Sequence, residues 1–270
     1  VLLYQDKFAE AASALDNVIG VYSLVSDYGS QFLRFGENGP ESVFEIQYSN
    51  QSNWYDWGCA HCSEGNYAII MNGPRGWSGP EYAQGWSFNV PTAEFYNSFE
   101  EGDTRRDATV LDIEAFAAAT GANYTEGYDH TGYFNNKYIP RAGESGGQTE
   151  LNYLTNFRII RYSDVLLMAA EAYNRGGIDD GLAQEFLNQV RRRAFGDDDH
   201  DISASGTALT DAIWEERKFE LSLEGHRFFD LVRTGRASST ISGFVEGKHE
   251  VFPIPQQEVD ISGLTQNAGY

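Results

Sequence analysis

Apolar residues recur at helical spacing near both ends of the chain. At the start, Phe8, Leu15 and Ile19 share one helical face until Gly20 interrupts the pattern, which predicts an amphipathic helix. After residue 157 the same spacing predicts helices over 163–175, 181–195, 207–224 and 226–233. The first two of these helices are joined by a few residues and form a hairpin of roughly 34 residues, which is the period of tetratricopeptide repeats.

The middle of the chain lacks this period. Between residues 40 and 156, Gly, Asn, Ser and aromatic residues are frequent, and short apolar runs over 42–48 and 86–90 predict strands. Thr92 is predicted to cap a short helix that ends at Gly102. Long, ordered loops of this kind are where binding residues collect.

The expected fold class is therefore mainly α, with tetratricopeptide-like helical pairs and a loop-rich insertion that contains short strands. We expect a helical repeat segment at 1–39, a loop-rich ligand-binding region at 40–156 and a C-terminal helical region at 157–270. No capping residue and no initiator Met precede the first helix. The expectation is that the first segment is incomplete at its N-terminal side.

Composition and charge argue against two classes of partner. The 270 residues include 19 basic and 40 acidic side chains, which gives a net charge of −21. A nucleic-acid binder needs a basic stripe, and a protein held to anionic lipid needs a polybasic patch. The sequence has no apolar run of about 18 residues that would span a membrane, and it does not open with a signal peptide.

One predicted helix carries three carboxylates on one face. Glu216, Glu220 and Glu224 recur every four residues, and such carboxylates could serve a glycoside hydrolase as acid and base or nucleophile. However, Arg217 and Arg191–Arg193 lie nearby, and Arg lowers the pKa that a general acid needs raised. We therefore expect ion pairs between these carboxylates and Arg, and no enzymatic activity.

Cys59 and Cys62 have the spacing of a thiol oxidoreductase site. Residues 63–66 that follow are typical of a loop, whereas that chemistry needs a helix N-terminus. Zinc could bind Cys59, His61 and Cys62, but no second cluster completes a tetrahedral site. A local disulfide, formed in an oxidising compartment, is the expected state.

An acidic loop partly matches a calcium-binding pattern. Asp197, Asp199 and Asp201 occupy the first, third and fifth positions of such a loop. Ile202 stands where the pattern needs Gly, and Ala208 where it needs Glu. The expected state is a solvated loop, calcium is the alternative, and no other cofactor is expected.

Aromatic residues interleaved with polar ones lie between residues 53 and 86. Sugars present apolar C–H faces and polar edges, so a sugar site needs exposed rings beside amide and guanidinium groups. A small core beneath the loops is the alternative. Trp86 is assigned to that core because it lies in a predicted strand. The candidate carbohydrate contacts are Asn53, Trp54, Tyr55, Trp57, Asn72, Arg75, Trp77 and Tyr82.

Several segments spread along the sequence carry a pattern that belongs to one known family: Asn156–Ala172, Glu216–Gly235, Phe252–Pro255 with Gln266–Tyr270, Gly85–Thr92, and Phe99–Asp107. On these segments, nearly the whole sequence resembles the SusD/RagB family of nutrient-binding outer-membrane lipoproteins. The resemblance implies a helical scaffold that carries a loop-rich glycan-binding face, and it implies a binding protein rather than an enzyme.

The resemblance also implies a location and a partner. Members of this family sit at the cell surface on a lipid anchor, capture oligosaccharides, and deliver them to a TonB-dependent, SusC-like outer-membrane transporter. The family's N-terminal half, with its signal peptide and lipid-bearing Cys, has no counterpart in this sequence, and Cys59 and Cys62 are internal. The alternative is a lipoprotein of a peptide uptake system that acts mainly through protein contacts.

Overall fold

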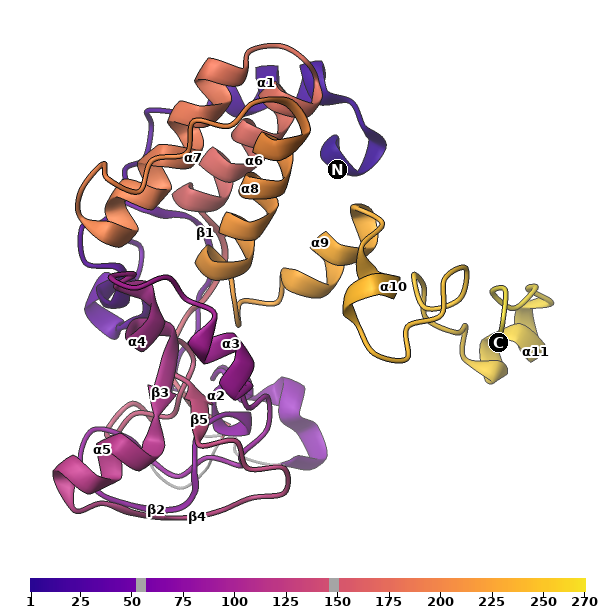
Figure 1. Ribbon diagram of the computed structural model, residues 1–270. Coiled ribbons are helices and arrows are strands. Elements are labelled where there is room, and N and C mark those ends of the chain that lie inside the picture. Colours follow the sequence, from indigo (N-terminus) through magenta and orange to yellow (C-terminus); the bar gives the residue numbers. More distant parts are fainter. Residues whose placement is uncertain (52–56, 146–150) are drawn as a thin grey trace. The chain divides into compact units, whose positions relative to one another are not determined.

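The computed structural model describes residues 1–51, 57–145 and 151–270 (Figure 1). The chain divides into two compact units, Val1–Glu224 and Gly225–Tyr270. Helices supply most of the regular structure and the strands are short. The mainly α class expected from the sequence is confirmed.

The scaffold of the first unit is helical. It consists of α1 (Phe8–Asp16), α6 (Tyr162–Arg175), α7 (Asp180–Phe195) and α8 (Gly206–Glu220). Helix α6 lies against each of the other three (Figure 1). The Asp179 carboxylate accepts a hydrogen bond from Leu182 N at the start of α7, and Gly196 ends that helix at φ +85°. The α6–α7 hairpin therefore has the boundaries that the sequence predicted.

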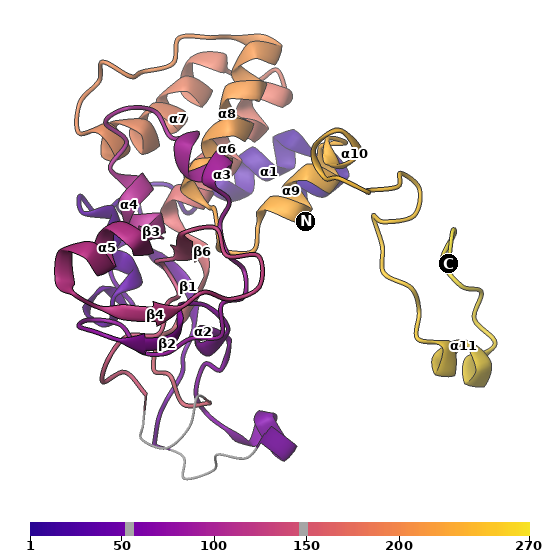
Figure 2. The same cartoon turned by 60° about the horizontal axis from the view of Figure 1, so that its bottom comes forward.

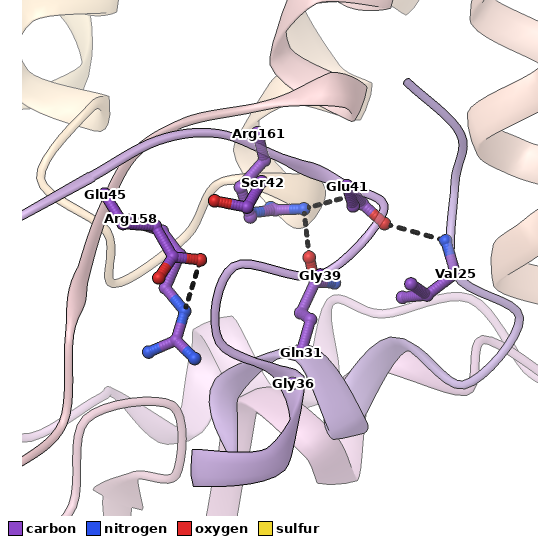
Figure 3. Close-up of a pocket in the computed structure, with 9 residues that line it drawn as sticks. All are labelled: Val25, Gln31, Gly36, Gly39, Glu41, Ser42, Glu45, Arg158 and Arg161. Carbon is purple, nitrogen blue, oxygen red and sulfur yellow. Dashed lines mark hydrogen bonds and ion pairs between the residues drawn. The ribbon is translucent and has the colours of Figure 1, made fainter. Parts of the chain in front are cut away.

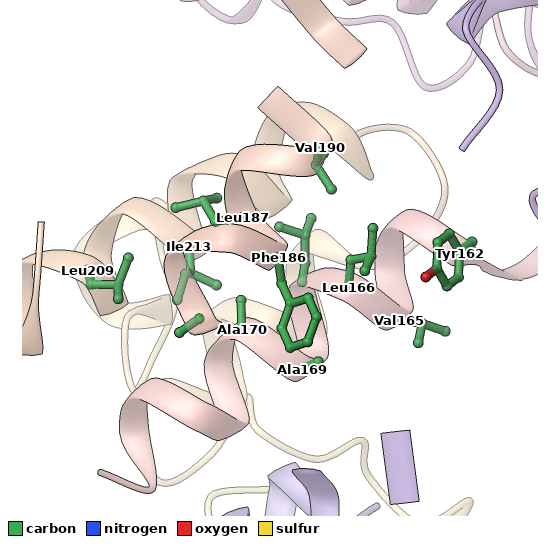
Figure 4. Close-up of a cluster of buried hydrophobic side chains, with 12 residues drawn as sticks. Tyr162, Val165, Leu166, Ala169, Ala170, Phe186, Leu187, Val190, Leu209 and Ile213 are labelled. Atoms are coloured by element: carbon green, nitrogen blue, oxygen red, sulfur yellow. The ribbon is translucent and has the colours of Figure 1, made fainter. Parts of the chain in front are cut away.

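A buried apolar cluster joins α6, α7 and α8 (Figure 4). Leu166, Leu187 and Ile213 lie at its centre with no exposed surface. The small side chains of Ala169 and Ala170 on α6 let the neighbouring helices approach closely. Truncation of one of these leucines to Ala would cost about 2–5 kcal/mol of unfolding free energy.

The loop-rich part of this unit contains short elements. Its helices are α2 (Ala68–Met71), α3 (Ala93–Asn97), α4 (Arg105–Thr109) and α5 (Ile113–Thr120). Its strands form three antiparallel pairs within the described residues: β1 (Ser42–Ile46) with β6 (Phe157–Arg161), β2 (Arg75–Ser78) with β4 (Asn123–Thr125), and β3 (Val110–Asp112) with β5 (Tyr133–Asn135). Short 3₁₀ segments cover Leu3–Gln5, Tyr28–Phe32, Arg34–Gly36 and Trp57–Cys62, the last of which is called η4.

The β1–β6 pair connects the loop-rich part to the scaffold. Strand β6 runs directly into α6, and β1 lies more than a hundred residues earlier in the chain. Figure 2 shows both strands beneath the helices. The boundaries expected at residues 39 and 156 therefore lie inside one compact unit, and the division into three functional regions stays a prediction.

Three local predictions are wrong in whole or in part. Residues 86–90 form no strand, because Ser87 and Asn89 have φ values of +59° and +52°, which no strand accommodates. The helix predicted at 207–224 ends at Glu220, and Leu223 takes a left-handed φ of +63°. The Thr92 cap is confirmed, since its hydroxyl accepts a hydrogen bond from Phe95 N, but α3 ends at Asn97.

The second unit contains α9 (Arg227–Arg233), α10 (Ala237–Thr240) and α11 (Gln256–Ser262). Helix α9 matches the predicted helix at 226–233. Residues 252–255 are free of regular structure, as their two prolines imply. Across the part of the chain that the structure describes, every helix is too short or too polar to cross a membrane.

Candidate functional site

Exposed aromatic rings gather in the loop-rich part of the first unit. Trp57 and Tyr67 are 44% and 45% exposed, and their ring centroids lie 6.2 Å apart at an interplanar angle of 75°. The Trp86 ring lies 5.3 Å from that of Trp57 at 32°. Phe88 is also exposed. We call Trp57, Tyr67, Trp86 and Phe88 the aromatic face.

A backbone ladder fixes one side of this face. Trp86 N donates to Ile70 O at 2.9 Å, and Phe88 N donates to Met71 O at 2.8 Å. Gly85 is required where residues 85–88 pass the end of α2, because a Cβ there would collide with the carbonyl oxygen of Asn72. The ladder holds Trp86 and Phe88 beside α2, which follows Tyr67 in the chain.

Arg75 borders the aromatic face. Its Nε donates to Trp86 O at 2.8 Å, and its guanidinium carbon lies 5.8 Å from the centroid of the Phe88 ring. Its backbone N donates to Ser87 Oγ at 3.2 Å, which ties β2 to the same segment. Arg75 is exposed, so its guanidinium can donate to a ligand's oxygens while the rings contact apolar surface.

A second tyrosine adds a hydroxyl near this face. Burial, and then the neighbouring Tyr67, raise the pKa of Tyr48 above its ordinary value. Tyr48 therefore remains a neutral phenol well above neutral pH. A protonated phenol both donates and accepts hydrogen bonds, as sugar hydroxyls do.

The loop that carries Trp57 is tied down just after the two cysteines. Cys59 and Cys62 form a disulfide, with their Cα atoms 5.4 Å apart. Ser63 Oγ donates to Asn152 Oδ1 at 2.7 Å, and Asn66 N donates to Tyr153 O at 2.8 Å. Because both sulfurs are bonded to each other, they are not thiolate ligands for zinc.

The predicted contact residues divide into groups. Trp57 and Arg75 lie at the aromatic face, whereas Asn53, Trp54 and Tyr55 lie outside the described residues. Their assignment as sugar contacts stays a prediction.

Of the other predicted contacts, Asn72 and Tyr82 are buried and Trp77 is half-buried. Asn72 is 5% exposed, and its Nδ2 donates to Tyr138 O at 2.9 Å. Tyr82 is buried and donates its hydroxyl to Asn136 Oδ1, and the Trp77 ring packs on those of Tyr82 and Phe116. These side chains support the loops, and their assignment as sugar contacts stays a prediction.

The aromatic face also contains residues that sequence reasoning did not select as sugar contacts. Trp86 packs against the buried cluster of Tyr28, Phe32, Ile69, Ile70, Tyr138 and Tyr153, so its assignment to a core beneath the loops is confirmed, although it lies in no strand. One face of this half-buried residue meets Trp57, and Phe88 beyond the left-handed turn at Ser87 is exposed. Tyr67 was visible in the aromatic pattern, yet nothing in that pattern separates exposed rings from buried ones. The only signal in the sequence for these residues is the high density of aromatic residues between 53 and 88.

A second cluster of functional groups lies inside the first unit. It consists of basic residues that face carboxylates from distant segments, and we call it the buried charge network. Its members are Lys137, Arg105, Arg161, Arg191 and Arg193 with Glu41, Asp103, Glu216, Glu220 and Glu224.

The three carboxylates of α8 and the turn after it are paired in this network, as expected. Glu220 is fully buried and accepts from Arg161 at 2.8 Å and Arg193 at 2.6 Å. Glu224 accepts from Lys137 at 2.7 Å. Arg217, which the sequence offered as a partner for these carboxylates, instead donates to Asp164 at 2.7 Å.

The electrostatics of these carboxylates do not suit acid catalysis. Burial opposes ionisation of Glu220, but Arg193, Arg161 and Arg105 together hold its pKa well below the usual range. Arg161 and Lys137 likewise outweigh burial and lower the pKa of Glu224. A general acid needs the opposite shift, toward the working pH.

A small cavity lies at the edge of the network (Figure 3). It has a volume of about 10 Å³, which is room for about one water molecule. In Figure 3, Arg161 bonds to Glu41 and Gln31, and Arg158 faces Glu45. A sugar ring does not fit this space.

The acidic loop does not assemble as a metal site. Asp197 Oδ1 accepts from Asp199 N at 3.1 Å, and the Asp201 carboxylate is paired with Arg192. Within residues 1–51, 57–145 and 151–270, no three His, Cys, Asp or Glu side chains are placed to hold one ion. Calcium binding at this loop therefore has no support from the geometry.

The resemblance noted in the sequence can now be compared with known proteins. A family model described as the SusD family matches residues 107–250, which is more than half of the chain. The chain belongs to the SusD family. The matched segment covers the network residues from Lys137 to Glu224, whereas the aromatic face lies before it.

Among curated SusD-family relatives, this chain is 31% identical to SusD-like protein P2 of Formosa agariphila over 255 residues. That alignment covers 85% of this chain and 48% of the relative. SusD-like protein P38 of the same organism is 27% identical, with 87% and 48% covered. The chain therefore spans about half the length of these curated relatives.

Solved structures of the SusD family share the fold. A laminarin binding SusD-like protein is 39% identical, with a TM-score of 0.88, and the match covers 100% of this chain and 60% of that one. Surface glycan-binding protein A from Bacteroides thetaiotaomicron, in complex with laminarihexaose, is 33% identical with a TM-score of 0.87. That match covers 98% of this chain and 61% of the Bacteroides protein.

Proposed function

We propose that this chain is the glycan-binding part of a cell-surface SusD-family protein that captures oligosaccharides. The observation that carries the proposal is the aromatic face, with Trp57, Tyr67 and Trp86 in mutual contact and Arg75 beside them. Flat rings cover the C–H faces of a pyranose, and a ring with two rotatable bonds loses little entropy on binding.

Laminarin-type glucan is the ligand that we propose first. Two similar structures, one described as laminarin binding and one in complex with laminarihexaose, match nearly all of this chain. The net charge of −21 supports a neutral glycan, because a polyanion would be repelled. Calcium plays no part in this proposal.

We further propose that the complete protein is lipid-anchored in the outer membrane and passes its ligand to a TonB-dependent, SusC-like transporter. Membership of the SusD family supports this placement. Crosslinking in intact cells should capture an outer-membrane barrel protein. Repeated failure to capture one, with the protein present at the surface, would argue against delivery to a transporter.

The ligand-binding proposal is tested by titration of the full-length protein with laminarin oligosaccharides. Trp57→Ala should cost about 2 kcal/mol of binding free energy, as for other aromatic anchors, which is roughly 30-fold in Kd. Tyr4→Ala is the matched control, because Tyr4 is an exposed aromatic residue on a different segment, Leu3–Gln5. It should leave Kd unchanged.

Two outcomes would contradict the proposal. Binding that survives the combined Trp57→Ala and Trp86→Ala changes would place the site elsewhere on the protein. Binding of unstructured peptides, with no binding of laminarin or other neutral polysaccharides, would favour the peptide uptake alternative.

A further inference from the structure

The segment that carries Trp57 has little regular structure of its own. Element η4 (Trp57–Cys62) is a 3₁₀ segment, and it is interrupted at Cys59, where φ is −142° and ψ is 65°. Runs of 3₁₀ helix this short have few hydrogen bonds and are marginal in isolation. A covalent bond within this element would add to the ring contacts that hold Trp57 against Tyr67 and Trp86.

The disulfide is the covalent constraint within this element. It joins Cys59, where the element is kinked, to Cys62, three residues later. The bond therefore closes the turn that follows the kink, and Trp57 lies two residues before that closed turn. At the other end, the chain is anchored at once by the bond from Ser63 Oγ to Asn152 Oδ1.

The rings that Trp57 contacts are fixed by other means. Trp86 is held by its backbone bond to Ile70 and by the bond that its carbonyl accepts from Arg75. Tyr67 directly precedes α2. Of the rings in the aromatic face, Trp57 is thus the one whose own segment contains a disulfide.

We propose that the Cys59–Cys62 disulfide is a positioning device for Trp57: it preorganises the indole against Trp86, and glycan affinity depends on it. This inference rests on the proposed glycan-binding function and adds how the site is preorganised. Reduction by an external dithiol would convert the disulfide to two thiols, with the dithiol oxidised to its own disulfide. The freed turn would then have to be ordered on binding, which lowers affinity.

The first test measures laminarin-oligosaccharide binding by the full-length protein with Cys59→Ser and Cys62→Ser together. Closing so short a loop contributes modestly, so we expect Kd to rise by about 5- to 20-fold. Wild type treated with dithiothreitol should show the same loss, and the double variant should show none on treatment. Unchanged affinity in the variant, while wild type binds, would overturn the inference.

A double-mutant cycle separates positioning of Trp57 from a general effect on the loop. In a Trp57→Ala background, adding the two Cys→Ser changes should have little further effect, because the residue that the disulfide positions is already gone. A loss of the same size in both backgrounds would show that the disulfide acts through other residues.

A readout in the free protein keeps the inference separate from the proposed function. The two indoles, 5.3 Å apart, should couple and give a near-ultraviolet circular dichroism signal that Trp86→Phe removes. Reduction should remove the same signal while the thermal midpoint changes little. If the signal persists on reduction, the positioning role is refuted even if glycan binding is never observed; if wild type shows the coupling but binds no glycan, only the proposed function fails.

Discussion

The buried charge network and the aromatic face belong to one compact unit. They differ in whether their functional groups are paired within the protein or exposed to solvent. In the network each carboxylate meets at least one cation, and desolvation is offset by pairs from distant segments. At the aromatic face, Trp57, Tyr67 and Phe88 and the Arg75 side chain are exposed, and only the half-buried Trp86 packs on the core. Groups that are fully paired stabilise a fold, whereas groups that are held but unsatisfied can bind a ligand.

Removal of one network cation should give the largest effect. Arg161 is fully buried and bonds to Glu41, Glu220 and Glu224. Arg161→Ala leaves those carboxylates without a central partner, so the unfolding free energy should fall by about 3–5 kcal/mol, measured by urea denaturation. Arg192→Ala, which breaks half-exposed pairs on the same scaffold, is the control and should cost below about 1 kcal/mol.

Asn72 sharpens the comparison. The sequence suggests that it contacts a ligand, whereas in the structure its side chain is buried and bonds to the backbone of neighbouring segments. Asn72→Ala removes the bonds to Tyr138 O and Ala68 O and leaves a buried carbonyl unsatisfied. We expect a loss of about 2 kcal/mol in stability by thermal or urea unfolding. Glycan affinity, measured well below the midpoint, should change little; a large loss of affinity with full stability would restore Asn72 as a contact.

Lys137 gives the network a pH dependence of unusual sign. Burial, opposed mainly by Glu224, lowers the pKa of Lys137 to about 8. In the unfolded chain Lys137 keeps its ordinary pKa of 10.5. Between about pH 8 and 10.5 the unfolded state therefore binds more protons than the folded state, and the unfolding free energy rises with pH over that window.

From pH 7 to 9 this effect should amount to about 1 kcal/mol relative to a Lys137→Met variant. Parallel denaturant titrations at the two pH values measure it. Identical pH profiles for the two proteins would mean that Lys137 keeps its charge over this range.

The carboxylates predict a second pH dependence of the same sign, at acid pH. Because the folded pKa values of Glu220 and Glu224 lie below the ordinary value of 4.5, their contribution is complete above about pH 4.5 and is lost as the pH falls through the folded values. Ligand binding at the aromatic face should show no such transition while the protein remains folded.

Arg75 should give the smallest effect. It is exposed and interacts with Phe88 and the carbonyl of Trp86. Arg75→Ala should leave stability within about 0.5 kcal/mol and weaken glycan binding by roughly threefold, which calorimetric titration can resolve. Arg75→Lys should recover little, because a lysine amine lacks the planar fork.

The helical scaffold was predictable because its signals are local. Apolar spacing, the Asp179 cap and Gly196 fix α7 to within a residue. The pairing of Glu216, Glu220 and Glu224 with arginine was also predictable in kind, but Arg105 and Arg161 are distant in sequence and adjacent only after folding.

The aromatic face was less predictable for a physical reason. Trp57 and Trp77 stand in similar aromatic, glycine-rich stretches, yet one is exposed and the other packs on Tyr82 and Phe116. Exposure there depends on turns such as those at Ser87 and Asn89, where left-handed φ values occur at residues other than glycine. The local sequence does not predict such turns.

One acceptor atom in the network constrains the order in which the chain can fold during synthesis. The carbonyl oxygen of Glu220, at the end of α8, accepts hydrogen bonds from Tyr28 Oη at 2.6 Å, Arg161 Nη2 at 2.9 Å and Lys137 Nζ at 3.1 Å. During synthesis these donors emerge long before residue 220, and until it follows they have no such acceptor. The loop-rich part therefore completes its folding only after α8 has been made, and a fragment cut before α8 would keep cations in its interior without their carboxylates.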